Sequence, residues 1–493
     1  MSLKNAMLNA QNFTLTENGA LTHRSTKSHV LDLFALGGSA NGINVDLLIR
    51  NALNENPVLA IKVIFYLSDI REGQGRRAFF RQALKVILSE DVDIARKLLS
   101  FVPEFGRWDY LYWFVGTILE RDALVLLRQE VLRAIDSGKP ALIFKWLASA
   151  DASSAETKRD AAITRKFFKL TPREYRKMLS KGREMLKEAV VERKMSAKEW
   201  SDIDYSKVPS VAMKRYRKAF ISHNPSHFEG FIKKVESGEA KINSSVLYPH
   251  DIVKAGESDR GVARRALAAQ WNALPNYLSD KVRALAVVDT SGSMMGDPIM
   301  IAASIGIYLA ERMKGEFHNS VISFSEVARL FELPNGDVFD KFNYLRRNSI
   351  VENTNLQSVF ELLLGTAKQA HVPAEEMPNR IIIMSDMEFD QAVAGQYNYR
   401  TGRYTQTSTN LDAIRSKYAA AGYEFPQIIF WNVNARHQQT PATMNDSGVI
   451  LVSGYSPVIM KSVLSDDPYI TPYKAMLNTI EVERYAFVDG ILA

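Results

Sequence analysis

Residues 284–293 read ALAVVDTSGS, an apolar run followed at once by an aspartate and two serines. A short continuous apolar run of this kind is typical of a buried strand in a parallel sheet. A second apolar run, residues 380–385 (RIIIMS), is followed by Asp386, and between the two runs Thr354 lies just before a helical pattern. Open α/β sheets bind their ligands at the carboxyl ends of the strands, so we expect these three segments to meet in one crevice.

The side chains of these segments carry oxygen atoms of the kind that hard cations prefer. Mg²⁺ is bound by carboxylate, hydroxyl and water oxygens at about 2.0–2.1 Å in near-octahedral geometry. We therefore expect a site for Mg²⁺ or another divalent cation, and the residues that would form it are Asp289, Ser291, Ser293, Thr354 and Asp386. The alternative interpretation is a serine-rich helix cap that lies beside an unrelated buried aspartate.

The chain after residue 280 alternates strand patterns with helical patterns. Strands are expected at residues 284–289, 319–324, 380–385, 427–432 and 448–452, and helices at residues 298–313, 356–370 and 410–421. Alternation of this kind is the signature of a mostly parallel, doubly wound sheet.

From about residue 30 to about residue 271 the chain has the periodicity of helices. Residues 57–69 are apolar nearly all round, which indicates a helix covered by neighbours on every side. Gly73, Gly75 and Gly106 lie between successive helical patterns, where short turns would join antiparallel helix pairs. The prediction is a multidomain chain with an all-α, HEAT-like solenoid at residues 1–280 and an α/β domain at residues 281–493. Closure of the solenoid into a ring stays open at this point.

Positive charge is concentrated in the middle of the chain. Residues 139–234 contain 23 Lys and Arg against 11 Asp and Glu, whereas the net charge of the whole chain is only +7. The rest of the chain is therefore net acidic, and the basic segment suggests a polyanionic partner, RNA. The candidate RNA-binding residues are Lys158, Arg159, Arg165, Lys166, Arg173, Arg176, Lys177, Lys214, Arg215, Arg217 and Lys218. Phe167, Phe168, Tyr175 and Tyr216 are interleaved with them, as stacking on bases would require.

Composition excludes several classes of site. The chain has no cysteine, which rules out disulfides, thiolate zinc sites and cysteine nucleophiles. Residues 1–13 show no basic-then-apolar signal pattern, and no apolar run approaches the roughly 18 residues that a membrane span needs. From these features we expect a soluble, cytoplasmic protein without a membrane partner.

The candidate metal ligands resemble the metal-ion-dependent adhesion site of von Willebrand factor A domains, in residue type, order and strand–loop context. Residues 69–77, 102–107 and 209–220 resemble motifs of a phage, bacterial and plant family that joins a helical domain to such an A domain. That family is similar in plan to the TROVE-domain proteins, the Ro ribonucleoprotein autoantigens. The resemblance implies a HEAT-like helical ring closed by the A domain, binding of noncoding RNA on a basic surface, and a metal ion that keeps one position open for an oxygen of a partner.

The leading hypothesis is a Ro-like RNA-binding protein that is not an enzyme. One alternative is an adaptor that docks an acidic protein partner at the metal site, with the basic helices incidental. A lower-ranked alternative is a metal-dependent nuclease, in which Glu388 and Asp390 would recruit a second ion. The oligomeric state and the identity of the RNA are not fixed by the residues.

Overall fold

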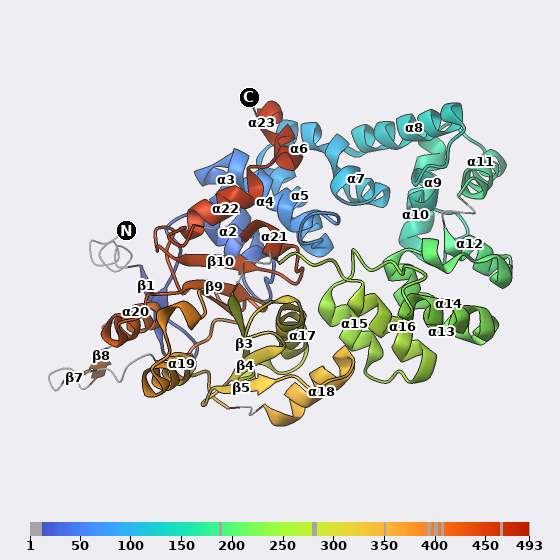
Figure 1. The fold of residues 1–493 in the computed structure, drawn as a ribbon. Coiled ribbons are helices and arrows are strands. Elements are labelled where there is room, and N and C mark those ends of the chain that lie inside the picture. Colours follow the sequence, from blue (N-terminus) through green and yellow to red (C-terminus); the bar gives the residue numbers. More distant parts are fainter. Residues whose placement is uncertain are drawn as a thin grey trace.

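The protein is described here by a computed structural model that covers residues 12–186, 190–278, 283–349, 352–391, 396–398, 403–405, 409–463 and 467–492. Figure 1 shows a helical region that leads into a region where strands and helices alternate. This confirms the prediction of helices followed by an α/β region. In the described residues before 279, strands occur only in a short hairpin near the N-terminus, β1 (Phe13–Leu15) and β2 (Leu21–His23).

The helical region follows that hairpin. Its helices are α2 (His29–Gly37), α3 (Val45–Glu55), α4 (Pro57–Ser68), α5 (Arg77–Glu90), α6 (Val92–Leu98), α7 (Val102–Phe105), α8 (Glu120–Ser137), α9 (Ile143–Trp146), α10 (Ala155–Phe167), α11 (Pro172–Glu184), α12 (Val191–Ser196), α13 (Ser210–His223), α14 (Pro225–Glu236), α15 (Pro249–Gly256) and α16 (Gly261–Asn272), with a 3₁₀ segment η2 (Trp108–Phe114).

Local sequence explains where several of these helices begin. The side-chain oxygen of Asn56 accepts a hydrogen bond from the backbone N–H of Leu59, and a proline follows Asn56 at the first turn of α4. Thr171 and Glu174 form a reciprocal capping box at the start of α11, and Pro172 occupies the first turn of that helix. Helix α4 is buried nearly all round, as its apolar pattern predicts.

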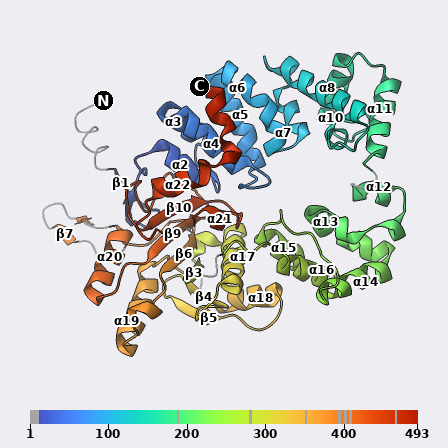
Figure 2. The same cartoon turned by 45° about the horizontal axis from the view of Figure 1, so that its top comes forward.

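Consecutive helices of this region pack against one another. Helix α3 contacts α2, α4 and α5, and α13 contacts both α14 and α16. In Figures 1 and 2 the helices run as an arc that leaves the α/β region near α6, passes through α8–α11 and α12–α14, and returns at α15 and α16. Helix α15 then contacts α17 (Asp297–Arg312) and α18 (Val338–Asn348), so both ends of the arc rest on the α/β region.

The central sheet is mixed and mostly parallel, in the order β10-β9-β6-β3-β4-β5. Its strands are β3 (Ala284–Asp289), β4 (Ser320–Phe324), β5 (Arg329–Glu332), β6 (Arg380–Ser385), β9 (Gln427–Asn432) and β10 (Val449–Ser453), and a separate pair is formed by β7 (Gln396–Asn398) and β8 (Arg403–Thr405). The five expected parallel strands are confirmed. The antiparallel edge strand β5 is an addition that the sequence did not predict, because its residues are mostly exposed and lack an apolar pattern.

The sheet is doubly wound, because alternate side chains of its strands enter two separate cores. Ala286 and Val288 of β3 join a core shared with α17 and α2, whereas Leu285 and Val287 join a core with α19 (Gln357–Ala370) and α20 (Asn410–Ala421). This is the two-residue period of a strand covered on both faces. The strand order reverses between β3 and β6, and a ligand crevice is expected at the carboxyl ends of these two strands.

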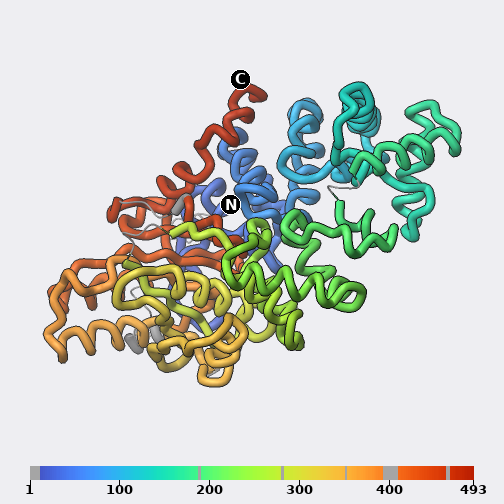
Figure 3. Tube along the Cα trace, turned by 45° about the vertical axis from the view of Figure 1, so that its right-hand side comes forward, coloured from blue at the N-terminus to red at the C-terminus, as the bar shows by residue number. Residues whose placement is uncertain are grey.

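The two parts of the chain are interlocked in space. Helix α2 packs on β10, and a Cβ added at Gly38 would lie 2.4 Å from the carbonyl oxygen of Ser453. The last helices, α22 (Pro472–Ile480) and α23 (Phe487–Leu492), return to contact α4. Figure 3 shows this C-terminal segment in red beside the blue N-terminal helices. A domain boundary at residue 280 stays a prediction, and N-terminal helices complete one face of the C-terminal sheet.

Candidate metal centre and candidate nucleic-acid surface

Asp289 is the last residue of β3, at the point where the strand order reverses. Its side chain is fully buried, and both carboxylate oxygens accept hydrogen bonds. Oδ1 accepts the backbone N–H of Ser291 at 2.9 Å, and Oδ2 accepts the hydroxyl of Ser385 at 2.6 Å. The carboxylate therefore spans the crevice between β3 and β6.

The two serines after β3 extend the same cluster. They lie at a tight turn, η5 (Gly292–Met294), and the hydroxyl oxygens of Ser291 and Ser293 are 3.2 Å apart. Asp386 follows β6, and its Oδ1 accepts the backbone N–H of Glu388 at 3.2 Å. Ser293 also lies close enough to Asp386 to lower the pKa of that carboxyl group.

Thr354 reaches the cluster from the loop before α19. Its carbonyl oxygen accepts the backbone N–H of Asp390 at 2.8 Å, which ties the loop to the segment after β6. The backbone N–H of Asn355 bonds to Ser325 beyond the end of β4. The five candidate ligands thus come from three loops that are joined by hydrogen bonds at one edge of the sheet, as the sequence predicts.

Burial makes this cluster unfavourable for two negative charges. Burial raises the pKa of Asp289, and the negative charge of Asp386 raises it further. Burial also raises the pKa of Asp386, which the hydrogen bond from Glu388 and the charge of Arg436 offset only in part. Two buried carboxylates next to two hydroxyls are a donor set that a hard divalent cation would neutralise, so the residues present fit such an ion.

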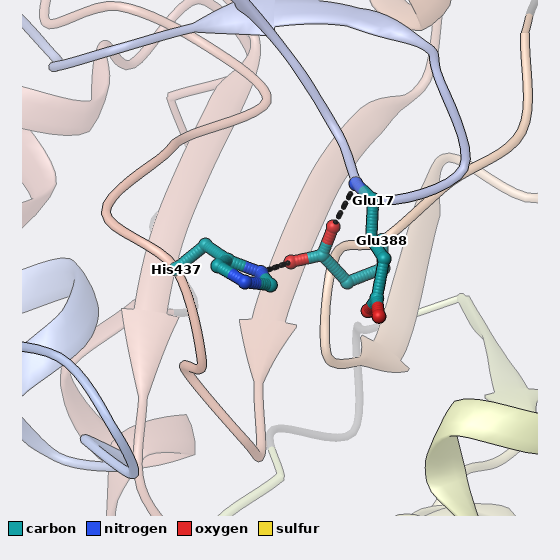
Figure 4. Close-up of side chains that lie close together, drawn as sticks. All are labelled: Glu17, Glu388 and His437. Carbon is teal, nitrogen blue, oxygen red and sulfur yellow. Dashed lines mark hydrogen bonds and ion pairs between the residues drawn. The ribbon is translucent and has the colours of Figure 1, made fainter.

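Three residues that the sequence did not single out, Glu17, Arg436 and His437, lie beside this cluster. Nη2 of Arg436 is 3.1 Å from Oδ2 of Asp386 and 2.6 Å from Oε2 of Glu17. Figure 4 shows Glu388 between Glu17 and His437: its Oε2 accepts the backbone N–H of Glu17 at 2.7 Å, and its Oε1 lies 2.7 Å from Nδ1 of His437. Because Glu17 is about 370 residues away in sequence, no local pattern could have placed it here.

These contacts bear on whether Glu388 is available to bind a metal ion. Glu17, Glu388 and His437 offer ligand-type atoms within 4.8 Å of one another. However, both carboxylate oxygens of Glu388 are engaged by protein donors, and Arg436 pairs with Glu17. The contacts join the N-terminal segment to the loops after β6 and β9.

The candidate RNA-binding residues lie on three helices. On α10 and α11 the side chains of Lys158, Arg159, Lys166, Arg173, Arg176 and Lys177 are exposed, and Arg165 is half-buried. Arg165 donates to the carbonyl oxygen of Leu170 at 3.1 Å, and Arg159 pairs with Asp160. The exposed members of this group leave α10 and α11 with strongly basic surfaces.

The group on α13 is different, and one of its members is a correction. Arg217 is buried, and its guanidinium pairs with Asp259 and donates to the carbonyl oxygens of Lys214 and Ala255. Arg217 is therefore a structural residue and is removed from the candidate RNA-binding surface. Lys214 pairs with Asp251 at 3.0 Å and Lys218 with Asp259 at 2.8 Å, while Arg215 is exposed.

Two of the four aromatic residues expected to stack on bases are also corrected, whereas Phe167 and Tyr216 are partly exposed. Phe168 and Tyr175 are buried, and the hydroxyl of Tyr175 donates to the carbonyl oxygen of Ala148 at 2.7 Å. Other partly exposed aromatic rings lie on elements that adjoin α10 and α11. The guanidinium of Arg107 is 4.1 Å from the ring centre of Trp146 in α9, and that of Arg77 is 5.9 Å from the ring centre of Trp113 in η2.

Comparison with known proteins gives two family matches and a viral relative. Residues 283–483 match a family described as a domain of unknown function, DUF7788, and residues 16–89 and 141–283 match a second, DUF2828. The chain is also similar to uncharacterized protein L728 of Acanthamoeba polyphaga mimivirus, with 28% identity over 515 residues, which covers 95% of this chain and 87% of the relative. The two family matches meet at residue 283, next to the predicted boundary.

Among the residues that the structure describes, no helix combines the length and the apolar character needed to cross a bilayer.

Proposed function

We propose that the α/β region is a von Willebrand A-type domain whose crevice binds Mg²⁺ or another divalent cation, and that the ion holds an oxygen of an acidic partner. The observation that carries the proposal is the convergence of Asp289, Ser291, Ser293, Thr354 and Asp386 at the carboxyl edge of the sheet. The strand order, with one antiparallel edge strand, supports the same assignment.

The proposed role is binding and not catalysis. The ion would supply positive charge and an open coordination position, which a carboxylate fills well. The protein's own residues would hold that charge in place, because the carboxylates of Asp289 and Asp386 are fixed by hydrogen bonds from Ser291, Ser385 and Glu388. The nuclease alternative loses support, because the Glu388 oxygens that would bind a second ion are engaged by His437 and Glu17.

The metal proposal is tested by calorimetric titration with Mg²⁺ and Mn²⁺ of the intact protein and of two variants, Asp289→Ala and Asp386→Ala. Both variants should lose the heat of binding and keep the far-ultraviolet circular dichroism of the wild type. Asp136→Ala, an exposed aspartate on α8, is the matched control and should bind like the wild type. Wild-type protein that fails to bind either ion at millimolar concentration would refute the proposal, and so would full binding by Asp289→Ala.

We further propose that the helical region binds RNA, with α10 and α11 as the main contact surface. The supporting observation is the set of exposed basic side chains on these two helices, next to half-exposed Trp113 and Trp146. Phosphate attraction combined with aromatic stacking binds single-stranded RNA with little sequence preference. The arc of helices with both ends on the α/β region is similar in plan to the TROVE-domain Ro proteins, which adds to the support.

The RNA proposal and the adaptor alternative differ in their response to salt. Each phosphate contact with single-stranded nucleic acid contributes about −0.7 to the slope of log affinity against log salt. The variant Lys166→Glu/Arg173→Glu/Lys177→Glu should therefore lower the steepness of that slope by about 2 for a labelled hairpin RNA with a single-stranded tail. The charge-matched control is Arg329→Glu/Arg347→Glu/Lys368→Glu, which changes exposed residues of the α/β region. Equal losses of RNA affinity in both variants, or a wild-type RNA affinity that does not depend on salt concentration, would favour the adaptor alternative.

A further inference from the structure

The proposed cation site is covered by the protein itself. Asp289, Ser291, Thr354 and Asp386 are each at most 2% exposed, and only Ser293 is partly open to solvent. A site that takes a ligand from a partner must expose one coordination position. The segment that contacts the candidate ligand Thr354 is the tip of the β1–β2 hairpin, residues 16–20, which reaches the crevice from the opposite end of the sequence.

The hairpin tip is held in the crevice by specific contacts. The side-chain amide of Asn18 donates to the hydroxyl of Thr354 at 3.2 Å and to the carbonyl oxygen of Glu388 at 2.7 Å. The hydroxyl of Thr16 donates to the carbonyl oxygen of Phe389 at 2.7 Å, and Gly19 forms an isolated antiparallel bridge with Asp390. Asn18 thus bonds directly to one candidate metal ligand and to the chain just after another.

The positively charged side chain of Arg436 links the hairpin tip to the site. The Arg436 guanidinium lies between Oδ2 of Asp386 and Oε2 of Glu17, at 3.1 and 2.6 Å. One positive charge therefore bridges a carboxylate of the site and a carboxylate of the hairpin. A divalent cation at Asp386 would repel Arg436 and attract Glu17, because it carries twice the charge in the same place.

We propose that Glu17 is an internal ligand of the cation site, and that a partner with an acidic turn binds by displacing the Glu17–Asn18 tip. The inference rests on the proposed cation site and adds the chemistry of the partner: a carboxylate next to a carboxamide, presented on a turn. The chain's own tip has this chemistry, and its Asn18-Gly19 pair is a strong turn signal.

The tip competes with a partner as a tethered ligand. A short tether gives an effective concentration of the order of 1 mM, so a free peptide with a dissociation constant of about 100 µM would bind about tenfold more weakly to wild-type protein than to protein without the internal ligand. Glu17→Gln removes the charge and keeps the shape of the side chain.

The first test measures the tip directly, by hydrogen–deuterium exchange of residues 16–20 with and without Mg²⁺. The reporting amides include Glu17, whose N–H bonds to Glu388, and Gly19 and Ala20, whose N–H groups bond to Thr16. Mg²⁺ should slow exchange in the wild type at least threefold and leave exchange in Glu17→Gln unchanged. Calorimetry on the same samples reports whether the ion binds.

The outcomes separate the two proposals. Mg²⁺ binding without slower exchange, or equal slowing in Glu17→Gln, would overturn the internal ligand and leave the cation site standing. Absence of Mg²⁺ binding in the wild type would refute the site, and the internal ligand with it.

The second test uses a labelled synthetic peptide with the sequence of residues 12–24, NFTLTENGALTHR, in fluorescence anisotropy. In Mg²⁺ it should bind the Glu17→Gln protein about tenfold more tightly than the wild type. The same peptide with glutamine in place of its glutamate is the control and should not bind. Equal affinity of the peptide for both proteins, or equal binding of both peptides, contradicts the proposal.

Discussion

Replacement of Arg217 by alanine should destabilise the protein by about 3 kcal/mol. This cost is expected although Arg217 lies in a basic helix whose sequence predicts exposure to solvent. The side chains of Arg217 and Asp259 are 8% and 1% exposed, and Nη2 of Arg217 is 2.5 Å from Oδ2 of Asp259. Removal of one partner of a buried pair typically costs about 3–5 kcal/mol, because the other charge remains buried. We take the lower value because Lys218 also pairs with Asp259, at 2.8 Å, and would retain part of the compensation.

The assay is urea unfolding of the intact chain, followed by tryptophan fluorescence, on the single variants Arg217→Ala and Asp259→Ala and on the double variant. The double variant should be less destabilised than the sum of the singles, by about 1–3 kcal/mol, because it leaves neither charge unpaired. Arg215→Ala, an exposed neighbour on α13, is the control and should change stability by less than about 0.5 kcal/mol. A cost below about 1 kcal/mol for Arg217→Ala, or a double variant equal to the sum, would refute the buried pair.

Two further predictions concern packing and pH. Gly182→Ala should destabilise α11 by about 1–3 kcal/mol, because the new methyl group would lie 2.2 Å from the ring of Phe144. Gly230→Ala in α14 meets no atom within 4 Å and should instead stabilise by about 0.4–1 kcal/mol, so opposite shifts of the urea midpoint are expected. Burial alone would raise the pKa of Asp259, but its contacts with Lys218 and Arg217 hold that pKa below its ordinary value. The contribution of this pair to the free energy of unfolding should therefore be complete above about pH 4 and should decline as pH falls through the lowered pKa of Asp259. Urea unfolding at several acidic pH values should show a smaller loss of stability in Asp259→Ala than in the wild type.

The candidate metal centre could be predicted because its information is local. Each buried strand is a short apolar run, and each oxygen-bearing residue stands at a fixed place in or just before a loop. Once β3 and β6 are parallel neighbours, their carboxyl ends must lie at the same edge of the sheet, so Asp289 and Asp386 meet without any further information.

The basic helices show where local information ends. Arg215, Arg217 and Lys218 are nearly adjacent in one helix, yet Arg217 is buried and the other two are exposed. Charge counts cannot tell them apart, because the burial of a charge depends on a partner, and the partner of Arg217 lies 42 residues further along the chain. The aromatic residues near these helices are divided in the same way between core and surface.

The sequence by itself determined the succession of a helical region and an α/β region, the five parallel strands and the ligand-type residues at their ends, because hydrophobic periodicity and loop residues are local features of each segment. Only the tertiary structure decided what covers each surface. Helix α2 packs on β10, more than 400 residues away in sequence, where the hydroxyl of Ser453 donates to the carbonyl oxygen of Phe34. The Glu17–Asn18 tip likewise lies over the candidate metal site, where Asn18 donates to the hydroxyl of Thr354. An apolar face is stable only when another segment buries it, and a cluster of buried carboxylates only when other groups compensate its charge. Many segments of the chain could do this, and the packing of the whole chain decides which segment does.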